Sequence, residues 1–327
     1  MLDNTMIYRA HRLKIAIAIV IILACARTLL SLPSTIRRSF SAPPPPQQPP
    51  VRRIPDVEIA AAKMKGEDTS WFERYLSQWR ANTYVVNDPT AELTVPANKG
   101  REAMVYLTYI IDRYHSLPDI VLFLHAERFQ WHNDNPDYDG LWSLQNLNLS
   151  HIRTSGYVNL RCVWVLGCPG EIKPVEDEAA TPTDGSSEIH TKHVFKRALQ
   201  ELLPGMDVPT VVGVPCCAQF AVTREAILQR PREDYVRYRK WLLETPLGDN
   251  LSGRVLEYAW HIVFGTPAVH CPAAGDCYCK LYGLCGLDCQ ENECQGRYVL
   301  PRAASLPEGW PKIGWNGAER DFKGPLE

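Results

Sequence analysis

Hydrophobic positions between residues 56 and 124 follow two different spacings. Residues 56–62 and 83–86 are short apolar runs bounded by polar turns, and residues 120–124 form a continuous apolar block, as in a strand covered on both faces. Residues 70–79 and 102–114 instead repeat their apolar side chains at the spacing of an amphipathic helix. The pattern therefore predicts strand, helix, strand, helix, strand, which is typical of a parallel sheet with right-handed crossovers.

The pattern continues to about residue 310 and predicts a single α/β domain over residues 56–310. Further elements are expected as helices over 138–149, 224–229, 232–244 and 249–265, and as strands over 156–165 and within 211–222. Residues 171–193 are acidic, rich in Pro, Thr and Ser and without apolar periodicity, which predicts a flexible loop. Residues 311–327 are expected to form a tail.

The amino-terminal residues carry a signal for entry into the secretory pathway. Basic side chains in residues 1–14 precede an uncharged apolar run at residues 15–26. Two interpretations remain open: a cleaved signal peptide, or a single-pass signal anchor over residues 15–32 with residues 1–14 as its cytosolic tail. The proline-rich residues 33–55 then form a stem. We expect an ER or Golgi membrane protein, or a secreted one if the segment is cleaved.

The near balance of acidic and basic side chains limits the classes of macromolecule that the protein can bind. The chain has 35 basic and 37 acidic side chains, which argues against nucleic-acid binding, because a nucleic-acid binder presents a strongly basic face. Two triplets, beginning at Asn148 and Asn250, fit the N-glycosylation acceptor pattern and agree with exposure to the lumen. The membrane, through the amino-terminal segment, is the expected partner.

Ten of the eleven cysteines lie outside the amino-terminal apolar run. An even number in a lumenal protein predicts disulfides, and a zinc site of thiolates is the alternative. The six cysteines within residues 271–294 are expected to form a small stapled segment. Cys216 and Cys217 are adjacent, and because a bond between neighbours is strained we expect each to pair with a distant partner.

A polar turn precedes the helix expected at residues 102–114. It contains Asn98, Lys99, Gly100 and Arg101. The free N–H groups of a helix start, together with two cations, are suited to holding anionic phosphates. The alternative is an ordinary helix start.

Four polar side chains follow the strand expected at residues 120–124: His125, Glu127, His132 and Asp134. Ligands of open α/β sheets bind outside the carboxyl ends of the strands. A mixture of imidazole and carboxylate groups suits manganese or zinc better than calcium. The alternative is a polar loop whose histidines bond neighbouring carbonyl groups.

The helix expected at 249–265 carries polar residues beside its buried face. Glu257 is a candidate general base or ligand of a substrate hydroxyl, with Asp249, Arg254 and His261 near it. The alternative is an ion pair between Glu257 and Arg254, whose spacing of three residues also permits it.

From residue 71 to residue 285 the chain resembles the family catalogued as domain of unknown function 3431, found largely in fungi. The resemblance is carried by Lys99-Gly100-Arg101-Glu102 and by residues 106–111, 117–119, 123–126, 130–134, 216–220 and 252–258. It implies a fold shared with that family and names no activity.

More remotely, the order of parts resembles glycosyltransferases of the GT-A fold. Asn98-Lys99-Gly100 stands at the Asn-x-Gly turn of those enzymes, and His125-Ala126-Glu127 stands where their Asp-x-Asp motif holds manganese and the diphosphate of a nucleotide sugar. This resemblance implies a mixed, mainly parallel sheet flanked by helices, with a disulfide-rich carboxyl-terminal segment. Donor-binding candidates are Asp68, Asn98, Lys99, Gly100, Arg101, His125 and Arg254.

The first functional hypothesis is transfer of a sugar from a nucleotide donor to a glycan or glycoprotein, with a divalent cation such as Mn²⁺ as cofactor. Its catalytic candidates are Glu257, Asp249 and His261. A second hypothesis is a non-catalytic lumenal module that binds carbohydrate or protein, with Trp131 and Trp142 stacking on sugar rings. A third is a metal-dependent hydrolase built on the His and Glu cluster.

Overall fold

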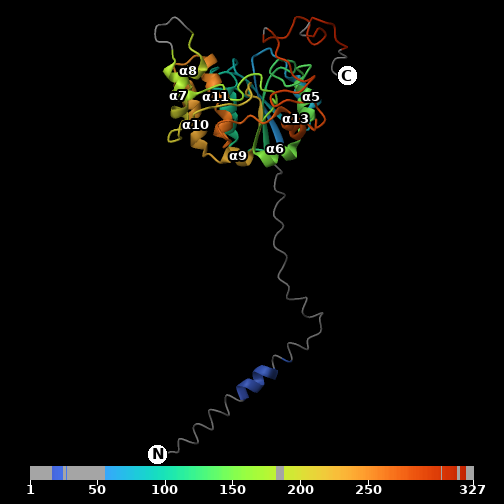
Figure 1. Ribbon diagram of the computed structural model, residues 1–327. Coiled ribbons are helices and arrows are strands. Elements are labelled where there is room, and N and C mark those ends of the chain that lie inside the picture. Colours follow the sequence, from blue (N-terminus) through green and yellow to red (C-terminus); the bar gives the residue numbers. More distant parts are fainter. Residues whose placement is uncertain are drawn as a thin grey trace, which may run out of the picture. The chain divides into compact units, whose positions relative to one another are not determined.

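The computed structural model describes residues 17–24, 27, 56–181, 188–302, 304–314 and 317–321 (Figure 1). The chain divides into two compact units, Met1–Arg53 and Ile54–Glu327, which we describe separately. In the first unit residues 17–24 are helical, and no helix within the described residues is long and apolar enough to span a bilayer. The expected cytosolic tail and proline-rich stem lie outside the described residues.

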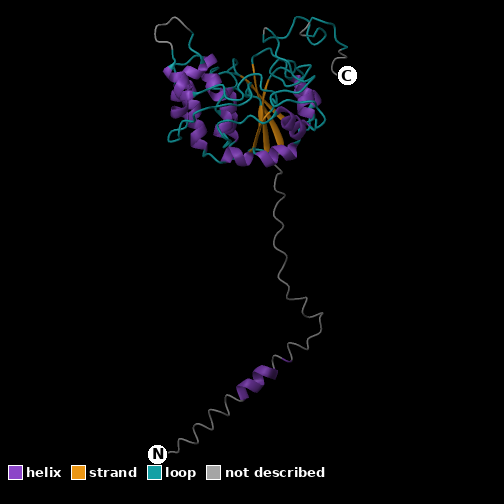
Figure 2. Ribbon diagram, in the orientation of Figure 1, coloured by secondary structure: helices purple, strands orange, loops and turns teal. Residues whose placement is uncertain are grey.

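One five-stranded sheet lies at the centre of the second unit (Figure 2). Its strands are β1 (Val57–Lys63), β2 (Arg80–Val85), β3 (Ile120–His125), β4 (Tyr157–Asn159) and β5 (Phe220–Thr223), in the order β2-β1-β3-β5-β4. β1 pairs in parallel with β2 and β3, whereas β5 runs antiparallel to β3 and β4. The mixed α/β sheet expected from the sequence is confirmed.

Helices cover both faces of this sheet. Along β3, Val121 and Phe123 enter one hydrophobic core, while Ile120, Leu122 and Leu124 enter the other, because successive side chains of a strand point to opposite faces. One core includes α4 (Ala103–Arg113), α8 (Thr191–Leu202), α9 (Arg224–Leu228), α10 (Arg232–Glu244), α11 (Asp249–Glu257) and α12 (Trp260–Val263). The other includes α3 (Ser70–Tyr75), α5 (Gly140–Gln145), α6 (Leu149–Ser155) and α13 (Ala274–Tyr282). Figure 1 shows α8, α10 and α11 on one side of the sheet and α5 and α13 on the other.

Two of the predicted helices are broken. The segment 138–149 contains α5 and the start of α6, because the Asp139 side chain accepts from the N–H of Leu141 and the Asn148 side chain accepts from the N–H of His151. Each cap begins a new helix. The segment 249–265 contains α11 and α12, separated where the N–H of Ala259 bonds three residues back, to the Leu256 carbonyl. The tighter turn interrupts the α-helical pattern.

The prediction of a flexible loop over 171–193 is wrong at two places, where helices form within it. Residues Pro174–Ala179 form a helix, α7, and α8 begins at Thr191. Proline at the first helical position and acids in the first turn, Glu176 and Asp177, stabilise the start of this helix. Residues 182–187 lie outside the described part of the chain.

The ten described cysteines form five disulfides, so the disulfide prediction is confirmed. The pairs are Cys162–Cys277, Cys168–Cys271, Cys216–Cys217, Cys279–Cys285 and Cys289–Cys294. The first two tie the carboxyl-terminal segment to the region that follows β4, so this segment is not a self-contained knot. The expectation that the adjacent cysteines have distant partners is wrong, because Cys216 and Cys217 bond to each other.

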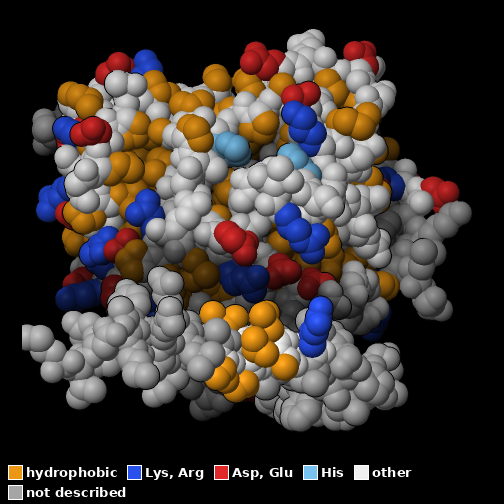
Figure 3. Space-filling view, turned by 90° about the horizontal axis from the view of Figure 1, so that it is seen from below, with side chains coloured by type: hydrophobic (Ala, Val, Ile, Leu, Met, Phe, Trp, Pro, Cys, Tyr) orange, Lys and Arg blue, Asp and Glu red, His pale blue; other side chains and the backbone are white. Residues whose placement is uncertain are grey.

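Charged groups of both signs are interspersed on the surface shown in Figure 3, the side of the molecule that carries α6 and α9 in Figure 1. This arrangement agrees with the near balance of acidic and basic residues. The side chains of Asn148 and Asn250 are both exposed, as a glycosylation acceptor must be.

Candidate active site at the ends of β1 and β3

The turn before α4 has an unusual backbone. Gly100 and Arg101 both have positive φ, 69° and 56°. Glycine is favoured at position 100 by its positive φ, and a Cβ atom there would also lie 2.4 Å from Cδ1 of Leu242, whose side chain would have to move. A left-handed arginine costs on the order of 1 kcal/mol, and such strain is concentrated at functional sites.

Lys99, a donor-binding candidate, and Asp249, a catalytic candidate, both hold this turn in place. Asp249 at the start of α11 accepts a hydrogen bond from the N–H of Gly100 at 3.0 Å. The Lys99 ammonium donates to the carbonyl oxygens of Leu243 and Thr245, at 3.1 and 2.5 Å, at the end of α10. Lysine is well placed there because the last carbonyls of a helix carry partial negative charge. Because Lys99 is bonded to these carbonyl groups, Arg101 is the cation of the turn whose side chain is exposed.

A cleft lies beside this turn, at the carboxyl ends of β1 and β3. It consists of two adjoining hollows that share Arg101, Glu102, His125 and His132. The first, of about 420 Å³, we call the β1 hollow, and its lining also includes Lys63, Asn98, Glu127 and Gln130. The second, of about 160 Å³, we call the Glu257 hollow, and its lining also includes Trp131, Glu171, Cys216, Cys217, Arg254 and Glu257.

The two imidazoles of the cleft are oriented by Gln130. Its amide nitrogen donates to the Glu127 carbonyl at 2.9 Å, so its oxygen faces Nδ1 of His125 at 3.3 Å and Nδ1 of His132 at 3.0 Å. Each ring therefore carries its proton on Nδ1. Burial lowers the pKa of His125, and it lowers the pKa of His132 to about 2, so both are neutral. Nε2 of His125 is buried with no hydrogen-bond partner among the described residues, which leaves its lone pair for a ligand.

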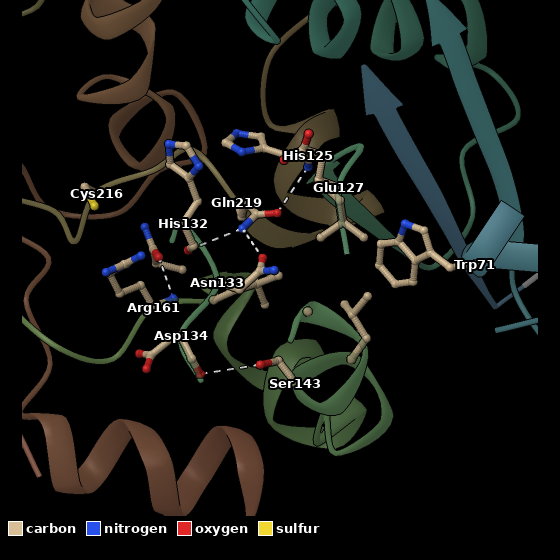
Figure 4. Close-up of a pocket in the computed structure, with 15 residues that line it drawn as sticks. Trp71, His125, Glu127, His132, Asn133, Asp134, Ser143, Arg161, Cys216 and Gln219 are labelled. Carbon is tan, nitrogen blue, oxygen red and sulfur yellow. Dashed lines mark hydrogen bonds between the residues drawn. The ribbon is translucent and has the colours of Figure 1, made fainter. Parts of the chain in front are cut away.

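Gln219, the residue before β5, links the backbone of His125 to the side chain of Asn133 (Figure 4). Its side-chain oxygen accepts from the N–H of His125 at 3.1 Å, and its nitrogen donates to Asn133 at 3.0 Å. The hollow around these groups is about 20 Å³, which is room for about one water molecule. We therefore place ligand binding in the two larger hollows.

Asp134, one of the four metal-ligand candidates, has another role. Its Oδ2 accepts from the N–H groups of Cys162 and Val163, at 2.5 and 3.3 Å, and its Oδ1 accepts from the Tyr278 hydroxyl at 2.5 Å. Within the described ranges, no three His, Cys, Asp or Glu side chains are arranged to hold a metal ion.

Glu257, at the end of α11, faces the second hollow. Its Oε1 accepts a hydrogen bond of 2.6 Å from the N–H of Cys217. Cys217 and Ala218 both have positive φ, 94° and 49°, and this backbone turns the N–H toward the carboxylate. No ion pair between Glu257 and Arg254 is found in the described part of the chain, although the Arg254 charge lowers the pKa of Glu257 against the larger opposing effect of burial.

Glu102, which is not among the site residues expected from the sequence, lines both hollows. It precedes α4 directly, where an acidic residue is an ordinary helix-stabilising feature and so gives no functional signal. Withdrawal from water raises the pKa of Glu102 to about 7. The pKa of Glu257 is also raised, first by burial and then by the negative charge of Glu102.

Comparison with known protein families matches residues 59–280 to the family described as "Protein of unknown function (DUF3431)". The chain belongs to this family. The matched region contains the strands β2 to β5 and every residue that the two hollows share. No curated protein and no solved structure matches the chain.

Three further candidates lie outside the cleft of this DUF3431 protein. His261 is fully buried and its Nε2 bonds the Ala268 carbonyl at 2.9 Å, with its pKa lowered to about 4 by burial. Asp68 accepts from the N–H of Ser70 at 2.8 Å and lines a separate hollow beside β2. Trp142 packs under the guanidinium of Arg297, with 5.0 Å from its carbon to the ring centroid, whereas Trp131 does line the cleft.

Proposed function

We propose that this protein transfers a sugar from a nucleotide donor to a hydroxyl group of a glycan or glycoprotein. The observation that carries the proposal is that a cation, Arg101, and a carboxylate, Glu257, line one cleft at the carboxyl ends of parallel strands. Ligands of α/β sheets bind at this edge. In sugar transfer a hydroxyl attacks the anomeric carbon as a phosphate leaves it. A cation can stabilise the leaving phosphate, and a carboxylate can take the proton of the hydroxyl.

The donor occupies the β1 hollow in this proposal. Its volume, about 420 Å³, lies within the range of roughly 300–1,000 Å³ for small-molecule sites. Arg101 and Lys63 supply positive charge there, and a guanidinium can hold two phosphate oxygens at once. Asn98, whose side chain is exposed at the rim, supplies a further hydrogen-bonding group.

The acceptor occupies the Glu257 hollow. Glu257 takes the proton of the acceptor hydroxyl as its oxygen attacks the anomeric carbon, which is general base catalysis. Trp131 offers an apolar face for a sugar ring, and Nε2 of His125 accepts a hydrogen bond from a ligand hydroxyl.

The transfer proceeds without a protein-bound metal in this account, because the side chains around His125 and Glu127 do not form a ligand set for Mn²⁺. Arg101, which lines both hollows, carries the positive charge that offsets the developing negative charge of the leaving group. The hydrolase alternative loses support for the same reason, since it depended on the four-residue cluster.

The proposed setting is the lumen of the secretory pathway, with the amino-terminal segment serving as the membrane anchor. Five disulfides are compatible with an oxidising compartment, where glycan and glycoprotein acceptors are also found.

A thermal-shift panel of nucleotide sugars and nucleoside diphosphates tests the proposal on the full chain. A ligand that binds only the folded state adds RT ln(1 + [L]/Kd) to the free energy of unfolding and so raises the thermal midpoint. We expect at least one nucleotide to raise it equally in EDTA and in Mn²⁺. Glycans that stabilise the protein when no nucleotide does would indicate a binding module and overturn the proposal.

A further inference from the structure

A third hollow lies apart from the cleft, in the helical layer on one side of the sheet. Residues of α7, α8 and α10 and the segment 245–247 line it, and Figure 1 shows these three helices grouped together. Its volume is about 290 Å³, close to the lower end of the range of roughly 300–1,000 Å³ for small-molecule sites. We call it the Trp241 hollow. None of its lining residues lines the β1 hollow or the Glu257 hollow.

Trp241, near the end of α10, is the largest apolar side chain of this hollow and is held in one orientation. The partly exposed indole packs against the hydrophobic core that contains α8 and α10. Its Nε1 donates to Oε2 of Glu201 at 2.7 Å. Glu201 is itself held by Arg197, whose Nε donates to Oε1 at 3.1 Å. The hollow therefore has a preorganised aromatic surface, which reduces the entropy cost of binding a ligand.

The charges of the hollow are paired with one another. Glu201 forms an ion pair with Arg197 at 3.1 Å, and Glu178 forms one with Lys196 at 2.6 Å. Nδ1 of His193 accepts from the N–H of the residue before α8, so the proton of this ring lies on Nε2. Because the two acids and the two bases cancel, the site offers no net attraction for an ionic ligand. A neutral ligand suits it best.

The lining of the hollow has an apolar part and a hydrogen-bonding part, as a pyranose sugar does. The C–H groups on one face of a sugar ring can pack on the indole of Trp241. Sugar hydroxyls can donate to the carboxylates of Glu178 and Glu201, and they can accept from Arg197 and from Nε2 of His193. A fatty chain or an apolar peptide would leave these polar groups without partners, which costs binding free energy.

We propose that the Trp241 hollow is a second carbohydrate site, which binds one pyranose unit of a neutral glycan with its ring on Trp241. The site adjoins the anchored turn before α4, because Thr245 lines the hollow and its carbonyl oxygen accepts from the Lys99 ammonium at 2.5 Å. The inference goes beyond the proposed function and does not depend on it, since a glycan can bind here whether or not the cleft transfers sugar.

Saturation-transfer difference NMR tests the inference on the full chain without nucleotide. The probes are chitotriose, mannotriose and lactose as neutral glycans, and tetramethylammonium as a cation. We expect a glycan signal that is strongest at the C–H protons of one face of a sugar ring. Trp241→Ala should weaken the affinity about tenfold, and Trp241→Phe should restore part of it. The control Trp164→Ala removes a tryptophan whose Nε1 donates to the Pro272 carbonyl, and it keeps the wild-type affinity.

Arg197→Ala provides a second variant that preserves the fold, because the Arg197 side chain is 83% exposed. It should weaken glycan binding about fivefold, through loss of a donor to the sugar and of the support for Glu201. Absence of a signal from every glycan, affinity unchanged in both Trp241→Phe and Arg197→Ala, or a signal from tetramethylammonium alone overturns the inference. Glycan binding that depends on Trp241, with no nucleotide bound by the cleft, would uphold the inference and overturn the proposed function.

Discussion

Oε1 of Glu257 accepts a hydrogen bond of 2.6 Å from the backbone N–H of Cys217. Cys217, which provides this N–H, forms a disulfide with the adjacent Cys216 and has a positive φ of 94°. A disulfide between adjacent residues closes almost no loop of chain, so it contributes little by restricting the unfolded state. We infer that it constrains the short turn whose N–H donates to a carboxylate in the cleft.

Replacing both Cys216 and Cys217 by alanine should separate activity from stability. We expect sugar transfer to fall about ten- to a hundredfold, as for a displaced general base, with a small change in the free energy of unfolding. The matched control is Cys168→Ala with Cys271→Ala, which opens a disulfide spanning 103 residues. That loss should reduce the free energy of unfolding by about 2–5 kcal/mol in urea denaturation. Equal destabilisation by both double variants would contradict this role.

The raised pKa of Glu102 links folding stability to pH. The pKa of Glu102 rises from 4.5 in the unfolded chain to about 7 in the folded protein. Its contribution to stability is therefore fully present at a pH below 4.5 and is lost as the pH rises through 7. Between pH 5 and pH 8.5 the free energy of unfolding of wild type should fall by up to about 3 kcal/mol more than that of Glu102→Gln. Chemical denaturation at the two pH values measures the difference. Parallel pH profiles for the two proteins would show that the pKa is not raised.

Gln130 should control the tautomers of two histidines. Gln130→Leu removes the acceptor shared by Nδ1 of His125 and of His132. In nitrogen-15 NMR spectra we expect both rings of wild type to be protonated on Nδ1, and the variant to populate the other tautomer. Acceptor binding should weaken about fivefold, because one hydrogen bond contributes roughly 1 kcal/mol. Gln145→Leu, at an exposed position on α5, is the control that leaves the rings unchanged.

Asp134 should affect stability and not metal binding. Asp134→Ala leaves the N–H groups of Cys162 and Val163 and the Tyr278 hydroxyl without their acceptor. Each buried group left unsatisfied costs about 1–3 kcal/mol, so we expect a loss of several kcal/mol in urea denaturation. Asp112→Ala, at an exposed position of α4, is the control. Unchanged stability, together with lost affinity for Mn²⁺ in calorimetry, would return Asp134 to the role of metal ligand.

The sequence predicted local structure well where a segment carries its own pattern. The block at residues 120–124 became β3, and residues 232–244 became α10 with the expected bounds. Such features depend on residues that are close in sequence, and the periodicity of hydrophobic residues reflects that local order.

Roles that depend on distant partners could not be predicted. Lys99 looked like a phosphate ligand, but its ammonium bonds carbonyl groups about 145 residues away in sequence, at the end of α10. Asp134 looked like a metal ligand, but its partners include Tyr278. Glu102 gave no signal because its position is ordinary for a helix start, and burial in the assembled cleft raises its pKa. Tertiary packing decides all three.

Nucleotide binding and sugar release by Arg101→Met and Glu257→Gln, measured side by side with wild type, test the central claim most directly. With a nucleotide sugar that stabilises wild type, Arg101→Met should lose the rise in thermal midpoint. Glu257→Gln should keep that rise but release nucleoside diphosphate about a hundredfold or more slowly, the usual cost of removing a general base. Normal release by Glu257→Gln, or an undiminished rise in Arg101→Met, would contradict a shared site for donor phosphate and acceptor hydroxyl.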